Sequence, residues 1–122
     1  MRLTVLGSAG SFPGPDSAAS GYLVQADDAD GRTWTVLLDL GNGALSPLQR
    51  YGDATALDAI GVSHLHSDHV ADLVVLNVLT QFVALPASPW WSVVTIVLGI
   101  FVLWALVVHG DEAQRASSAS LP

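Results

Sequence analysis

The chain has 122 residues, of which 51% are hydrophobic and 12% charged, and its mean hydropathy is +0.49. This composition disfavours disorder of the chain as a whole and is too apolar for an ordinary soluble domain of this size. Four arginines and eleven acids give a formal charge of −7, which excludes nucleic-acid binding by bulk charge, and the absence of cysteine excludes disulfides and thiolate metal sites. No charged residue lies between Asp72 and Asp111, so the sequence indicates two joined pieces.

The first piece has the pattern of a mixed α/β sheet, in which strands are separated by loops and one helix is inserted. A polar segment at residues 27–32 has the composition of a hairpin turn between two of these strands. Strands are predicted at residues 2–6, 21–26, 33–38 and 57–63, and a helix at residues 44–51.

The second piece is predicted to be helical and mostly apolar. Residues 73–85 are too short to span a membrane and indicate a buried helix, which prolines 86 and 89 end. Residues 90–108 are uncharged, and a helix of this length covers about 28 Å, close to the roughly 30 Å of a bilayer core. Trp90 and Trp91 stand at its start, as interfacial anchors do. We therefore predict a transmembrane helix here; the alternative is a core helix, but so small a domain has no core able to surround one.

These patterns predict three segments and a location. They are a partial α/β domain at residues 1–85, a proline-led transmembrane helix at 86–109, and a disordered polar tail at 110–122. The N-terminus shows no export signal, which predicts a single-pass membrane protein with a cytoplasmic N-terminal domain. Arg115 favours the opposite orientation, because the positive-inside rule would place the C-terminal tail in the cytoplasm.

Three of the four histidines fall within one six-residue segment. The pattern H-x-H-x-D-H comprises His64, His66, Asp68 and His69, and directly follows a predicted strand. Neutral imidazoles and a carboxylate suit Zn²⁺ and related divalent ions, and a turn just past a strand can aim several of them inward. The alternative is that Asp68 caps a helix and the histidines have no ligand role. Asp72, one turn further, is either a hydrogen-bonding partner of a ligand or a solvated carboxylate.

Three motifs together resemble the N-terminal half of a metallo-β-lactamase-fold hydrolase. They are TVLGSAGS at residues 4–11, LLDLG at 37–41 and SHLHSDH at 63–69. Within that superfamily the chain is most similar to the ribonuclease Z-like branch, which includes cyclic-nucleotide phosphodiesterases, and SGYLV at 20–24 supports that branch. The resemblance covers residues 1–76 and implies a truncated αββα half-domain followed by the transmembrane helix.

The resemblance implies a metal site and a reaction. His64 and His66 would bind one zinc, and Asp68 and His69 a second. The reaction would be hydrolysis of a phosphodiester, or of another small anionic substrate, by a metal-activated water, with Asp68 as ligand and catalytic orienting group. Asp39 matches a position near the metal pocket, where it would either fix its own turn or contact the site directly.

The chain also departs from the superfamily pattern. Complete members are much longer and take further ligands, including two histidines and a bridging aspartate, from the second half of the fold. His109 matches none of these, so the second metal site is incomplete unless a partner chain completes it. Three hypotheses follow: a membrane-tethered zinc hydrolase, a catalytically inactive truncated or fused fragment anchored in a membrane, and a membrane protein whose N-terminal piece is an interaction module.

Overall fold

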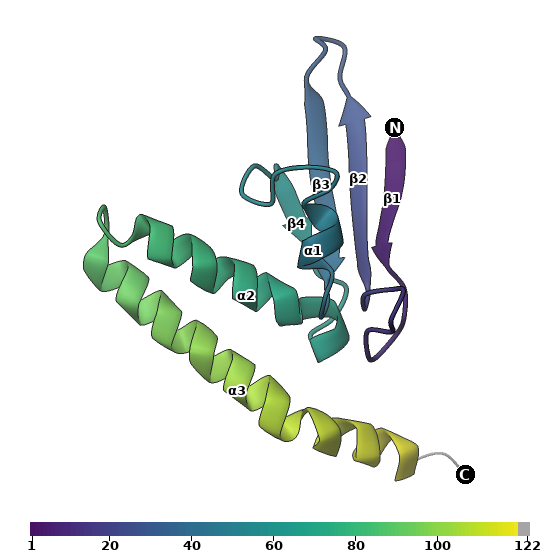
Figure 1. Ribbon diagram of the computed structural model, residues 1–122, viewed down its shortest axis with the longest axis vertical. Coiled ribbons are helices and arrows are strands. Elements are labelled where there is room, and N and C mark those ends of the chain that lie inside the picture. The colour runs from purple at the N-terminus through teal and green to yellow at the C-terminus, as the bar shows by residue number, and fades with distance from the viewer. Residues whose placement is uncertain (120–122) are drawn as a thin grey trace. The chain divides into compact units, whose positions relative to one another are not determined.

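The computed structural model describes residues 1–119, with side chains described up to His109. The chain forms two compact units, which are residues 1–76 and a second unit that begins at Asn77. Helix α2 (Ser67–Ala84) runs from the first unit into the second. Figure 1 shows the strands in the first unit and helix in the second.

The first unit is built on a four-stranded sheet with strand order β1-β2-β3-β4. Its strands are β1 (Arg2–Gly7), β2 (Gly21–Asp27), β3 (Thr33–Leu40) and β4 (Ala59–Gly61). The first three pair in antiparallel fashion, whereas β3 and β4 are parallel, and the crossover between them contains α1 (Leu45–Leu48). The mixed α/β class predicted from the sequence is confirmed.

The β2–β3 hairpin closes through the carboxylate of Asp28. Its Oδ1 accepts hydrogen bonds from the backbone N–H groups of Asp30 at 3.0 Å and Arg32 at 2.9 Å. Gly31 has a φ of +82°, a backbone conformation that is unfavourable for residues other than glycine. The turn therefore forms where the sequence predicts it, for the reason expected of Asp and Gly in turns.

One face of the sheet carries the core of the first unit. Leu23 and Leu37 lie directly opposite each other on β2 and β3, and both are fully buried. Burial of each such side chain is worth roughly 1.5–3 kcal/mol. α1 and α2 contribute to the same cluster, whose buried members are Leu6, Ala18, Leu23, Leu37, Leu40, Ala44, Leu48 and Leu76.

Strand β4 and helix α1 are shorter than the sequence predicts. β4 covers Ala59–Gly61 rather than residues 57–63, because the backbone N–H of Ser63 donates to the carboxylate of Asp39 instead of extending the sheet. α1 is a single turn, after which Arg50 and Tyr51 make i→i−3 bonds that are too tight to continue an α-helix.

The second unit consists of the end of α2 and the long helix α3 (Pro89–Ala119). Pro89 suits the first helical position, where its missing N–H costs nothing. Within the described residues, Pro89–His109 is the one stretch of helix long and apolar enough to cross a membrane, and 17% of its most apolar window is buried.

Two boundaries differ from the sequence predictions. The first compact unit ends at Leu76, within α2, rather than at residue 85. α3 continues to Ala119, so residues 110–119 are helical where a disordered tail was predicted, and residues 120–122 lie outside the described part. Six of the ten residues 110–119 are Ala, Glu, Gln or Arg, which have high helix propensity, and the segment follows a helix that is already nucleated.

Candidate metal centre

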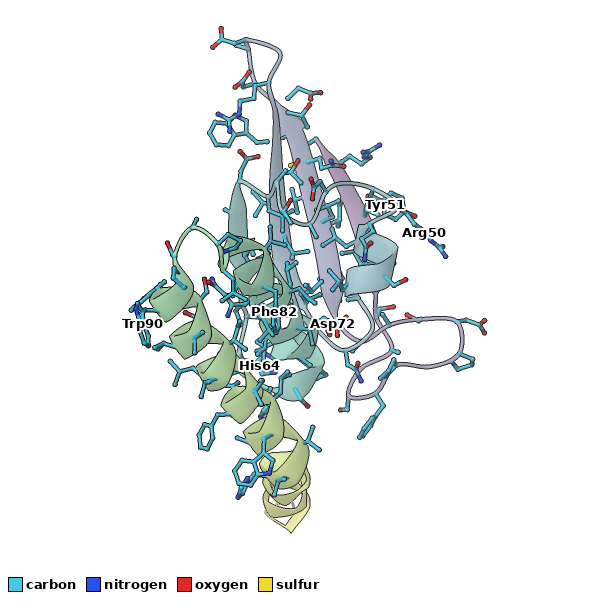
Figure 2. The ribbon with its side chains drawn as sticks, turned by 60° about the vertical axis from the view of Figure 1, so that its left-hand side comes forward. Arg50, Tyr51, His64, Asp72, Phe82 and Trp90 are labelled. Carbon is cyan, nitrogen blue, oxygen red and sulfur yellow. The ribbon has the colours of Figure 1, made fainter. Side chains whose placement is uncertain are left out.

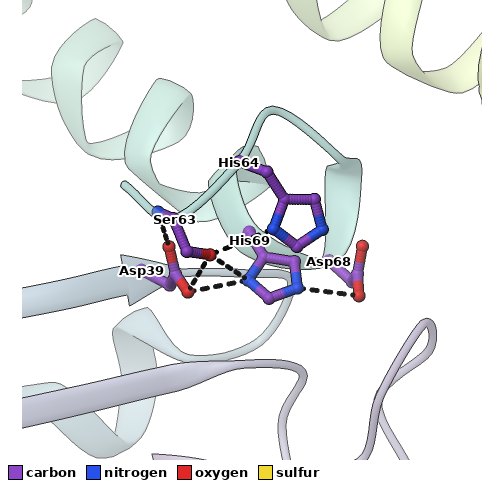
Figure 3. Close-up of polar contacts among 5 residues, drawn as sticks. All are labelled: Asp39, Ser63, His64, Asp68 and His69. Atoms are coloured by element: carbon purple, nitrogen blue, oxygen red, sulfur yellow. Dashed lines mark hydrogen bonds and ion pairs between the residues drawn. The ribbon is translucent and has the colours of Figure 1, made fainter. Parts of the chain in front are cut away.

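The candidate site lies where β3 and β4 end and α2 begins. Asp39 comes near the end of β3, Ser63 follows β4 by two residues, and Asp68 and His69 lie in the first turn of α2. Figure 3 shows these side chains together with His64. Segments that are distant in the sequence thus meet at the end of the sheet where β3 and β4 terminate.

Asp39 is the buried centre of this group. It is 5% exposed and has a φ of +56°, a left-handed conformation that Asp tolerates better than most residues. Its Oδ1 accepts the Ser63 backbone N–H at 2.7 Å, and its Oδ2 lies 2.8 Å from the Ser63 hydroxyl. The same Oδ2 lies 2.7 Å from Nδ1 of His69. The sequence left open whether Asp39 contacts the site, and the structure shows direct contact.

The charge state of Asp39 follows from these contacts. Burial raises the pKa of its carboxyl, but the hydrogen bonds from Ser63 and His69, together with the charge of His69, outweigh burial and hold that pKa below its usual range. Asp39 is therefore an anion at neutral pH, able to accept hydrogen bonds but not to donate them.

The three histidines of the motif lie close together, although they are held differently. Nδ1 of His69 faces Asp39, while its Nε2 lies 3.3 Å from Oδ2 of Asp68. The rings of His64 and His69 have centroids 3.9 Å apart, and those of His64 and His66 are 4.8 Å apart in an edge-to-face arrangement. His64 and His66 are exposed, so their rings have room to reorient.

Close backbone approach fixes the first turn of α2 against the sheet. The carbonyl of Asp68 accepts a hydrogen bond from the N–H of Ser20 at 3.1 Å, and Ser20 in turn accepts from Gly41 at 2.9 Å. A Cβ added at Gly41 would stand 1.7 Å from the Asp68 carbonyl oxygen. Position 41 therefore requires glycine if Asp68 and His69 are to stay where they are.

Asp72 has a different role from either that the sequence suggested. Its Oδ2 accepts the backbone N–H of Leu45 at 2.9 Å, so it ties α2 to the start of α1. The first backbone N–H groups of a helix have no acceptor within the helix, and the Asp72 carboxylate serves as the acceptor for one of them. Asp72 thus shows neither the hydrogen bond to a metal ligand nor the solvated state that were predicted.

Sequence reasoning missed Ser63 altogether. Its hydroxyl oxygen lies 2.8 Å from Asp39, 3.0 Å from Nδ1 of His64 and 3.2 Å from Nδ1 of His69. The available signal was its place directly before a cluster of metal-ligand residue types at the end of a strand. A small polar residue there is well placed to orient the side chains that follow.

The donor chemistry of this site suits a divalent metal. Three imidazoles and a carboxylate are ligands that Zn²⁺ accepts, and a carboxylate on the second nitrogen of a ligating histidine, as Asp39 is on His69, is a common supporting contact. Among the side chains that the structure describes, no group of three or more His, Asp or Glu surrounds one point that could hold an ion. The residues therefore fit a metal by type and proximity, and binding would require small movements among the four motif side chains, of which His66 is exposed.

His109 lies apart from this group in sequence and in environment. It sits in α3, where its ring makes an edge contact with Trp104 at a centroid distance of 5.8 Å. It belongs to the second unit, whereas the motif histidines belong to the first.

Comparison with known proteins identifies the fold that carries this site. The chain is 44% identical over 73 residues to the probable metallo-hydrolase YhfI of Bacillus subtilis, covering 60% of this chain and 28% of that protein. The crystal structure of YhfI, a metallo-β-lactamase-fold protein, matches 70% of this chain and 32% of its own with a TM-score of 0.56. An uncharacterized protein of Mycobacterium leprae is 48% identical over 73 residues, 60% of this chain and 24% of that protein.

A further relative gives the branch of the fold. Ribonuclease Z of Mycobacterium bovis is 35% identical over 91 residues, covering 71% of this chain and 31% of the enzyme. The N-terminal part of the chain therefore has a partial metallo-β-lactamase-fold, ribonuclease Z-like relationship, as the sequence motifs predicted. The chain spans about a quarter to a third of the length of these curated relatives.

A second match describes a different stretch of the chain. A family model described as a domain of unknown function, DUF7144, matches residues 59–111. The matched range begins at β4 and includes the histidine motif, α2 and the apolar part of α3. The matched range therefore covers both the histidine segment and the apolar stretch of α3.

Proposed function

We propose that the chain is a membrane-anchored, metal-dependent hydrolase that acts on a phosphodiester or another small anionic substrate. The observation that carries this proposal is the cluster at the start of α2. There Asp68 is in contact with Nε2 of His69, and the ring of His64 packs on the ring of His69. Asp39 accepts a hydrogen bond from the other ring nitrogen of His69, Nδ1. The relationship to metallo-hydrolases supports metal chemistry at this cluster.

Each motif residue has a distinct part in this proposal. His64, His66, Asp68 and His69 would hold the metal, with zinc as the expected ion. When bound, the metal would supply Lewis acidity and lower the pKa of a water to about 7. Asp68, whose side chain is 17% exposed, is accessible enough to orient an incoming water and to accept its proton at Oδ2.

Electrostatics favours a metal over side chains as the group that attracts an anionic substrate. The chain carries a formal charge of −7 and has only four basic residues apart from histidine. Of these, Arg2 and Arg32 are engaged with Gln25 and Asp58 on the sheet. A divalent ion at the motif would supply the local positive charge that a phosphodiester needs.

The anchor in this proposal is α3. Its apolar stretch Pro89–His109 has the length and composition of a membrane span, and exposed tryptophans Trp90 and Trp91 stand at its start. Their fused rings suit the headgroup region. In this proposal the first unit lies on the cytoplasmic side of the membrane.

A second candidate function is that of an inactive metallo-hydrolase fragment held at a membrane. The chain spans about a quarter to a third of its relatives, and no three potential ligands among residues 1–109 surround one point. A site that lacks its further ligands would bind metal weakly and leave the nucleophile unoriented. A partner chain that supplies those ligands would convert the second candidate into the first.

Hydrolysis of bis-p-nitrophenyl phosphate by the full chain in detergent micelles with added zinc separates these candidates. The hydrolase proposal predicts turnover that falls by about 10²–10⁴-fold in Asp68→Ala. The matched control is Asp30→Ala, which removes an exposed carboxylate at the hairpin tip and should leave the rate unchanged. Turnover that survives Asp68→Ala would refute the proposed site, and bound zinc without turnover would favour the inactive fragment.

A further inference from the structure

The Ser63 hydroxyl stands at the junction of three side chains that the proposed metal site uses. Its oxygen is 2.8 Å from Oδ2 of Asp39, 3.0 Å from Nδ1 of His64 and 3.2 Å from Nδ1 of His69. A hydroxyl has one proton to donate and can accept two. The direction of each of these contacts therefore follows from where that single proton goes.

The contact with Asp39 fixes that direction. Asp39 Oδ2 is an acceptor only, and both Ser63 Oγ at 2.8 Å and His69 Nδ1 at 2.7 Å reach it. If the Ser63 proton pointed elsewhere, two oxygen atoms would stand at hydrogen-bond distance with no proton between them, which is repulsive. Ser63 therefore donates to Asp39, and His69 donates to the same oxygen through Nδ1–H.

The remaining contact determines the state of His64. Because the Ser63 proton is engaged with Asp39, its oxygen can only accept from His64, so the proton of the neutral His64 ring must be on Nδ1. Both rings are then protonated on Nδ1, which leaves Nε2 of His64 and of His69 with a lone pair. Nε2 of His69 lies 3.3 Å from Oδ2 of Asp68, so two acceptors face each other there, an arrangement that a bound cation would stabilise. A metal binds the unprotonated nitrogen of a neutral imidazole.

We propose that Ser63 is a positioning residue that sets the tautomer of His64, and with Asp39 that of His69, so that both rings present Nε2 to a metal. The relevance to metal rests on the proposed function. The tautomers themselves are a property of the metal-free chain. The two histidines depend on Ser63 to different degrees, because His69 keeps Asp39 when the hydroxyl is removed and His64 has no other described partner at Nδ1.

Ring ¹⁵N NMR of the full chain in detergent micelles tests this directly. With ¹⁵N-labelled histidine and no metal, long-range proton–nitrogen correlations recorded at mildly alkaline pH report which ring nitrogen carries the proton. The four histidines are assigned by single His→Gln substitutions. We expect His64 and His69 in the Nδ1–H form. Finding His64 of the wild type in the Nε2–H form would overturn the proposal.

Substitutions at Ser63 provide the sharper comparison. In Ser63→Ala we expect His64 to leave the pure Nδ1–H form while His69 keeps it, and in Ser63→Thr, which keeps the hydroxyl, we expect the wild-type pattern. Ser67→Ala is the matched control, since it removes a hydroxyl from the same segment and should change neither ring. An unchanged His64 tautomer in a folded Ser63→Ala chain would contradict the proposal. The wild-type pattern in Ser63→Thr would show that the change in Ser63→Ala comes from loss of the hydroxyl and not from a general loss of structure.

Zinc affinity gives a second readout. Competition with a chelator should show affinity lowered by about 10–100-fold in Ser63→Ala, the usual cost of losing a supporting contact to a ligand, and restored in Ser63→Thr. If the wild type binds no zinc, the proposed function fails while the tautomer result still decides the role of Ser63. If zinc binds but Ser63→Ala has unchanged affinity, the role of Ser63 in metal binding fails while the proposed function stands.

Discussion

The first unit and helix α3 contain the same kinds of apolar side chain but differ in how many of them they bury. On the sheet, Leu23 and Leu37 are fully buried. Along α3, Trp90, which is labelled in Figure 2, is 86% exposed and Val97 is 59% exposed. Because apolar surface is costly in water, the first arrangement suits an aqueous domain and the second suits a helix whose surroundings are themselves apolar.

The two regions also differ in their polar side chains. The clustered His, Asp and Ser side chains all lie in the first unit, at the end of the sheet. In the uncharged segment between Asp72 and Asp111, the polar side chains of α3 are isolated, as Thr95 shows by donating to the carbonyl of Trp91 within its own helix. We therefore expect substitutions in the two regions to affect different measurements.

The same Leu→Ala change should have very different effects in the two regions. Leu37→Ala leaves a cavity in the core and should lower the free energy of unfolding of the sheet by about 2–5 kcal/mol. Leu98, 58% exposed on α3, has little packing to lose, so Leu98→Ala should cost α3 no more than about 0.5 kcal/mol. Hydrogen exchange of peptides from each region, measured in micelles, gives both values. Equal effects would mean that α3 is packed like a protein core.

A charge placed on α3 should affect membrane partitioning. Val97→Arg puts a cation near the middle of the apolar stretch and should make the free energy of membrane insertion less favourable by roughly 2.5–3.5 kcal/mol. The ratio of membrane-bound to free chain should then fall by about 100-fold. Leu3→Arg, at an exposed site on β1, should leave partitioning unchanged. Flotation with phosphatidylcholine vesicles measures this. A wild-type chain that stays soluble without detergent would contradict the anchor.

Two glycines in the first unit provide a matched pair. Gly41→Ala would force a methyl group onto the Asp68 carbonyl and should destabilise the first unit by roughly 1–3 kcal/mol while weakening zinc binding. Gly52→Ala meets nothing within 4 Å and should leave stability unchanged or raise it by up to about 1 kcal/mol. Hydrogen exchange and zinc titration check both. An undisturbed Gly41→Ala chain would show that the turn does not hold the site.

Acid should weaken the first unit partly through Asp39. Its pKa is lower in the folded chain than in the unfolded chain, so its contribution is present above the unfolded pKa of about 3.9 and is lost as pH falls through the folded pKa. Asp39→Asn keeps the size and shape of the side chain but removes its titration, and should make the free energy of unfolding less dependent on pH in that range. Urea unfolding at several acid pH values measures the difference. Identical pH profiles would contradict the role of Asp39.

Most of the fold could be predicted from the sequence because its signals are local. The strands β1, β2 and β3 are short apolar runs bounded by loop and turn residues, and each boundary is within two residues of its prediction. The ends of β4 and α1 could not be predicted, since they depend on which partner the chain finds in three dimensions. The N–H of Ser63, for example, bonds to Asp39, which lies 24 positions earlier in the chain.

The candidate site could be predicted only as far as its residues are contiguous. His64, His66, Asp68 and His69 form one short motif, so their proximity follows from the sequence. Asp39 and Ser63 join the site through hydrogen bonds between separate strands, which residue spacing along the chain does not encode.

The zinc content of the purified full chain tests the central claim most directly. Elemental analysis of protein prepared in detergent should find close to one zinc per chain, and His66→Ala should remove most of it. His109→Ala, which alters the histidine of the second unit, should retain the wild-type content. Absence of zinc from the wild type, or retention of zinc by His66→Ala, would contradict a metal centre at the start of α2.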